Sequence, residues 1–88
     1  MVEQATQNME LWEEPFFAGS IVEISADNRV LIENHKGIRE YSPTKICVGV
    51  SYGHIAVCGK EMHLCRMQKE RLIIRGKIES VVILRGNQ

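Results

Sequence analysis

From Ser20 to Leu84 the chain alternates between short runs of β-branched or apolar residues and clusters of turn-forming residues. This spacing is typical of short antiparallel strands joined by turns. Residues 20–85 show no apolar repeat every 3.6 residues, as an amphipathic helix would. The pattern therefore predicts an all-β domain of about seven or eight short strands, connected as hairpins and curled into a small sandwich or roll.

The stretch between the second and third predicted strands contains the tripeptide His35-Lys36-Gly37. We predict a three-residue hairpin loop here, with Gly37 in the left-handed conformation. This register would set Glu33 against Arg39, whereas a two-residue turn would set Glu33 against Glu40. Opposite charges across a strand pair are favoured over like charges, so the three-residue loop is preferred.

The segments IAVCGKEMHLCRM and LIIRGKIESVVIL, residues 55–67 and 72–84, share a Gly-Lys pair with apolar flanks. Each pair, Gly59-Lys60 and Gly76-Lys77, predicts a tight turn between two strands. A repeated β-arc, as in a short β-solenoid, is the alternative. Hairpins are favoured because solenoids usually need three or more repeats.

Residues 1–14 are mostly polar and acidic, and they predict a flexible N-terminal arm before a single β domain over residues 15–85. Pro15 ends any helical turn, because the residue before a proline is pushed toward extended backbone. Trp12, Phe16 and Phe17 lie at the end of the arm. They either pack on the edge of the core or form an exposed contact surface, and they are the candidate interaction residues.

Composition excludes several classes of function. The chain carries eleven basic and eleven acidic residues with no block of either sign, so nucleic acid is not an expected partner. The longest apolar run, VVIL at 81–84, is far shorter than the roughly 20 residues that span a bilayer, so no membrane span is expected. Because this run is apolar at both odd and even positions, it predicts a central strand.

The size of the chain bounds the number of domains, and its cysteines indicate the redox compartment. At 88 residues it forms one domain and buries only about 60–65% of its unfolded surface, so self-association would add stability. The start of the chain lacks the features of a secretory signal. Cys47, Cys58 and Cys65 are odd in number and scattered, which favours reduced thiols in the cytoplasm.

One face of the predicted hairpin around Gly59-Lys60 gathers potential metal ligands: His54, Cys58, His63 and Cys65. Two sulfurs and two nitrogens could hold zinc, but structural zinc sites place paired cysteines two to four residues apart, and here six residues intervene. The register would also set His54 against Cys65, without an orienting carboxylate for a nucleophile. We therefore predict no metal, cofactor or catalytic residue, and a small metal-binding or thiol redox module is the alternative.

Four short elements occur in a characteristic order: IENHKGI, YSPTKI, GHIAVCGK and LIIRGKIESV. With them, residues 15–85 resemble the YabP/YqfC sporulation protein family, in particular its YqfC-like branch. The resemblance implies a non-enzymatic protein in the mother-cell cytoplasm of a sporulating bacterium. It also implies protein contacts with other sporulation proteins, including membrane-associated ones, and leaves homo-oligomers open.

Overall fold

The computed structural model describes residues 19–86, which form six antiparallel strands in one sheet. The strands are β1 (Ile21–Ser25), β2 (Arg29–Glu33), β3 (Ile38–Tyr41), β4 (Lys45–Val50), β5 (Gly53–Met67) and β6 (Arg71–Arg85). Their order across the sheet is β1-β2-β6-β5-β4-β3. The all-β prediction is confirmed, and no helix that could cross a membrane occurs in the described residues. The predicted arm, residues 1–14, lies outside them.

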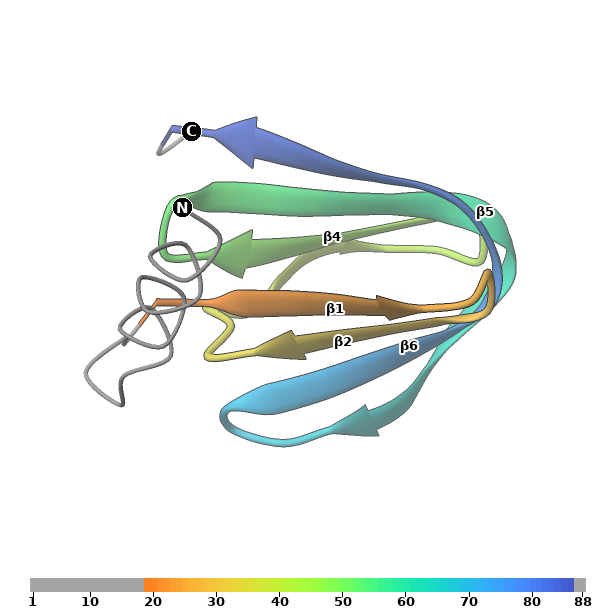
Figure 1. The fold of residues 1–88 in the computed structure, drawn as a ribbon, viewed down its shortest axis with the longest axis horizontal. Helices are drawn as coiled ribbons and strands as arrows, with labels where there is room; N and C mark the ends of the chain where they lie inside the picture. Colours follow the sequence, from red (N-terminus) through yellow and green to blue (C-terminus); the bar gives the residue numbers. More distant parts are fainter. Residues whose placement is uncertain (1–18, 87–88) are drawn as a thin grey trace, which may run out of the picture.

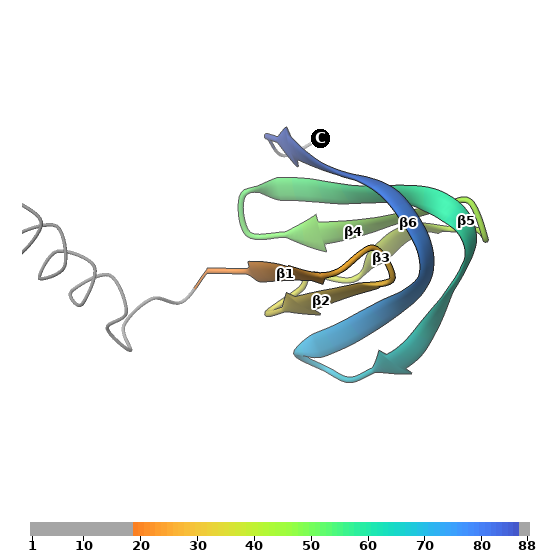
Figure 2. The ribbon, with the colours of Figure 1, turned by 45° about the vertical axis from the view of Figure 1, so that its right-hand side comes forward.

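The two longest strands fold the sheet over on itself. β5 and β6 each have 15 residues, pair with one another along their length and bend near the middle (Figure 1). β2 pairs with residues 71–75 of β6, and β4 pairs with residues 53–58 of β5. Each half of the long hairpin therefore carries one short hairpin, and the halves face one another as two layers (Figure 2).

The bends occur at the two Gly-Lys pairs. Lys60 lies opposite Lys77, and the β5–β6 register shifts on both sides of this point, which is the signature of β-bulges. A Cβ on Gly59 would collide with the carbonyl oxygen of Lys77, so the backbones approach too closely for any other residue. The predicted turns at these pairs are wrong: both strands continue through them, which gives six strands instead of seven or eight.

The similarity between residues 55–67 and 72–84 reflects an approximate two-fold symmetry between the two halves. The tip of each short hairpin is bonded to one bend: the Ile78 amide donates to the Asp27 carbonyl at 2.8 Å, and the Met62 amide donates to the Pro43 carbonyl at 2.9 Å. Neighbouring strands are all antiparallel. The repeat therefore describes two related halves, and the solenoid alternative is wrong.

The core lies between the two layers and receives alternate residues from four strands. Its fully buried side chains are Val30, Ile32, Ile46, Val48, Ile55, Val57, Leu72 and Ile74. All are aliphatic and most are β-branched, so they suit extended backbone as well as burial. Each such side chain stabilises the fold by about 1.5–3 kcal/mol through removal from water.

The predicted hairpin at residues 35–37 is also wrong, because β2 pairs with β1 and β6 and the chain then crosses to the other layer. Gly37 does adopt a positive φ of 106°, and the Lys36 amide donates to the Gly49 carbonyl of β4 at 2.7 Å. Glu33 pairs with Arg71 instead of Arg39. A distant basic residue satisfies the charge as well as the local one, so charge alone could not fix the register.

Candidate interaction surface

The four candidate metal ligands are spread along β5. His54 lies opposite Gly49 and Leu84, Cys58 opposite Lys45 and Ser80, and His63 opposite Arg75. The predicted pairing of His54 with Cys65 is wrong, because the two residues occupy opposite ends of one strand. Within residues 19–86 no group of three or more His, Cys, Asp and Glu side chains could hold a metal ion.

The three thiols are free. Cys47 and Cys58 are partly buried on the outer face of one layer, and Cys65 is exposed. Cys47 lies opposite Ala56 in the sheet. This position suits a small apolar side chain, which is how the sequence interpretation treated the cysteines.

The aromatic residues proposed as a contact surface, Trp12, Phe16 and Phe17, lie outside the described residues. Their role stays a prediction. Ser20 is the second residue that the structure describes. Its buried hydroxyl donates to the Asn34 carbonyl at 2.7 Å and accepts from the Ser51 amide at 2.9 Å. The Tyr52 hydroxyl also donates to the Ser20 carbonyl.

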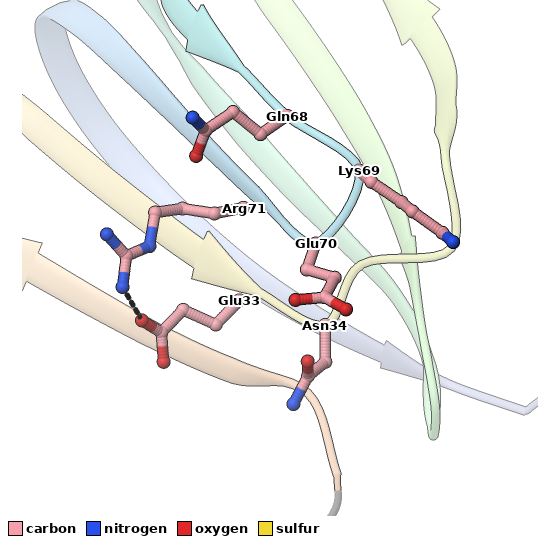
Figure 3. Close-up of a pocket in the computed structure, with 6 residues that line it drawn as sticks. All are labelled: Glu33, Asn34, Gln68, Lys69, Glu70 and Arg71. Carbon is pink, nitrogen blue, oxygen red and sulfur yellow. Dashed lines mark hydrogen bonds and ion pairs between the residues drawn. The ribbon is translucent and has the colours of Figure 1, made fainter.

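A polar hollow of about 390 Å³ lies where β2 ends and the β5–β6 turn begins (Figure 3). It is lined by Glu33, Asn34, Gln68, Lys69, Glu70 and Arg71. Arg71 and Glu33 form an ion pair at 2.8 Å, and the backbone N–H of Asn34 donates to the backbone carbonyl of Glu70 at 2.5 Å. These bonds fasten the turn to β2. The hollow is a structural junction.

The most conspicuous surface is apolar and lies on the last part of β6. Val82, Ile83 and Leu84 are 44%, 55% and 45% exposed. Val81 and Ile83 lie opposite the core residues Val57 and Ile55, so they point to the core side of the sheet, while Val82 and Leu84 point outward. Large apolar side chains exposed together mark an interaction surface more often than scattered ones do.

The exposure arises because this part of β6 is a sheet edge. Residues 80–85 pair with β5 on one side, and in the described chain no strand pairs with them on the other, since β2 ends its pairing at Arg75. A hollow of about 240 Å³ lined by Ile24, Ile78 and Val81 among others adjoins the edge. β6 therefore lies inside the sheet, as predicted, but its last part is an edge, which we name the β6 edge (residues 79–85).

Sequence interpretation identified the apolar run of the β6 edge but missed its role as a surface. The signal was present: residues 81–84 are apolar on both parities, which indicates cover on both faces of the sheet. In residues 19–86 only β5 pairs with residues 80–85.

One family of known proteins matches the chain. The model described as the YabP family matches residues 18–88, which include every strand of the sheet. No curated protein and no solved structure matches the chain.

Proposed function

Because the chain belongs to the YabP family, we propose that it is a non-enzymatic sporulation protein of an endospore-forming bacterium that acts through contacts with other proteins. The YabP family is not a known enzyme family. The observation that carries the proposal is the β6 edge, where apolar side chains and unpaired backbone groups are exposed together. Sheet edges of this kind bind additional strands.

The finer parts of the proposal rest on the resemblance that the four sequence elements carry. The resemblance implies the YqfC-like branch of the family, a place in the mother-cell cytoplasm, and partners among other sporulation proteins, including membrane-associated ones. The described residues support a contact function over a metal or redox function, because His54, Cys58, His63 and Cys65 are dispersed along one strand.

Spore formation tests the proposal directly. Deletion of the coding sequence should lower the yield of heat-resistant spores, and the intact chain should restore it. A Val82→Lys variant should restore it poorly, because the lysine places a charge in the middle of the β6 edge. Met67→Lys is the matched control: Met67 is 52% exposed at the far end of β5, and its variant should restore the yield fully.

Three results would count against the proposal. Normal spore yield in the deletion strain would remove the sporulation role. Equal restoration by both lysine variants would remove the β6 edge from that role. Stoichiometric zinc in the purified chain, lost on Cys58→Ser, would favour the metal-binding alternative. Pull-down from sporulating cells with a chain lacking residues 1–17 would test the Trp12, Phe16 and Phe17 surface separately.

A further inference from the structure

We propose that two copies of this chain pair through their β6 edges, antiparallel and around a two-fold axis at Val82, so that the two sheets continue into one another. The proposal rests on the contact function proposed for the β6 edge and names a second copy of this chain as the occupant of that edge. It gives residues 79–85 the second neighbour that they lack in the described chain, so that in the dimer β6 has a strand on both sides along its length.

The backbone groups of the β6 edge are oriented for such pairing. The Gly86 amide donates to the Tyr52 carbonyl, and the β5–β6 register continues from that pair through His54 and Leu84. In an antiparallel pair, alternate residues direct both N–H and C=O to the neighbouring strand. Val82 and Leu84 therefore bond toward β5, and Val81, Ile83 and Arg85 direct theirs to the open side. Within residues 19–86 these outward groups have no strand partner.

The faces of the sheet restrict the register. Val81 and Ile83 point to the core side, so a partner strand keeps the core face continuous only if odd residues oppose odd residues and even oppose even. This requirement places the two-fold axis on a residue. With the axis at Val82, Val81 lies opposite Ile83 of the partner subunit, and their outward backbone groups meet as hydrogen-bonded pairs.

Charge selects Val82 among the possible axes. With the axis there, Glu79 lies opposite Arg85 of the partner subunit, and this happens twice. With the axis at Val81, Lys77 would face Arg85 of the partner subunit, and with the axis at Ile83, Val81 would face that same arginine. Opposite charges across a strand pair stabilise it and like charges destabilise it, so of these three registers only the one at Val82 sets opposite charges against one another.

The length of the free edge also matches. It begins after Ile78, whose amide is already bonded to Asp27 of the β1–β2 turn. In the Val82 register, residues 79–85 of one copy lie beside residues 79–85 of the other, so the paired segment fills the open part of the edge. The formal net charge of zero adds no long-range repulsion between copies.

Charge reversal tests the register in the full-length chain. The intact protein should run as a dimer by light scattering coupled to size exclusion. Glu79→Arg and Arg85→Glu should each weaken dimerisation by about tenfold or more, because each turns two attractive pairs into repulsive ones. An equimolar mixture of the two variants should associate again, since each arginine then faces a glutamate. Circular dichroism checks that both exposed substitutions leave the fold intact.

Cross-linking tests the axis itself. Two Val82 residues would form a non-hydrogen-bonded pair with Cα atoms about 4.5 Å apart, within the range that a disulfide bridges. Val82→Cys should therefore give a disulfide dimer on mild oxidation, located by mass spectrometry at residue 82. Leu84→Cys is the matched control and should not link to itself, because residue 84 lies opposite Ser80 of the partner subunit.

The proposal fails on any of three results. The full-length chain could be monomeric at all concentrations, as expected if residues 1–18 of the same chain cover the β6 edge. The two charge variants could fail to associate when mixed. A dimer could form without a link at residue 82 in Val82→Cys, which would place the interface elsewhere.

Discussion

Ser20, just before β1, and Ser51, in the β4–β5 turn, form reciprocal hydrogen bonds. The Ser20 amide donates to the Ser51 hydroxyl at 3.1 Å, and the Ser51 amide donates to the Ser20 hydroxyl at 2.9 Å. Ser20 is only 3% exposed, so water cannot replace the lost bonds if the hydroxyl is removed. This short polar side chain fixes the start of β1 to the β4–β5 turn. Sequence alone gave no sign of the pair, because 31 positions separate its members.

We predict that Ser20→Ala lowers the free energy of unfolding by about 1–3 kcal/mol, since it removes two hydrogen bonds, one from the Ser51 amide and one to the Asn34 carbonyl, each worth about 0.5–1.5 kcal/mol. Urea unfolding followed by circular dichroism measures the change. Ser80→Ala is the control: Ser80 is exposed, its hydroxyl has no hydrogen-bond partner in the described structure, and the variant should stay within about 0.5 kcal/mol of the parent. Equal effects for the two variants would contradict the argument.

At the scale of elements, the decisive feature is how β5 and β6 bend. The sequence interpretation placed a turn at Gly59-Lys60, and in the structure Val57 and Met62 both lie in the core although one is at an odd and the other at an even position. Either geometry would shift the alternation of inward and outward side chains by one position. A two-residue turn does so by reversing the chain direction, and the bend does so by a bulge in which Glu61 has a φ of 53°. Glycine marks both structures, so only pairing with distant strands distinguishes them.

Gly76 allows a direct test of the bend. Its φ is 146°, and a Cβ there would lie 2.7 Å from the Met62 Cα. We predict that Gly76→Ala destabilises the fold by about 2–4 kcal/mol, from backbone strain together with displacement of β5. Gly37→Ala separates the two causes, because Gly37 also has a positive φ but its Cβ would meet only the end of Arg39 at 3.6 Å.

Gly37→Ala should therefore cost about 1–2 kcal/mol, the strain alone. Thermal unfolding of the two variants in parallel measures the difference. If Gly76→Ala proved no more harmful than Gly37→Ala, the close approach of the two long strands at the bend would not limit the choice of residue.

At the scale of the whole molecule, the class of fold followed from the sequence and the arrangement of strands did not. Alternating apolar residues predicted the β domain, because each strand buries one face. The same alternation cannot say which strands are neighbours: β2 lies beside β6, with residues 34–70 between them in the chain. Residues 81–84 were predicted to lie in a central strand because they are apolar at both odd and even positions. In the described chain, residues 80–85 pair with β5 alone.

Self-association should also appear in the stability of the whole protein. Because a dimer is favoured by mass action, the midpoint of thermal unfolding should rise with protein concentration. Val82→Lys should abolish this dependence by placing two lysines side by side at the axis, while Met67→Lys should retain it. Differential scanning calorimetry over a wide concentration range measures both. A midpoint that is independent of concentration in the parent chain would oppose the prediction.

The bonds that hold Tyr52 have one more consequence. Its hydroxyl donates to the Ser20 carbonyl, and its own carbonyl accepts from the Gly86 amide, so the first and last strands of the described domain end beside the same residue. The start and the end of the described chain therefore lie near one another. A circular permutant that links residue 86 to residue 19 and opens within the exposed β5–β6 turn would keep every strand neighbour, with its new ends beside Asn34 at the end of β2.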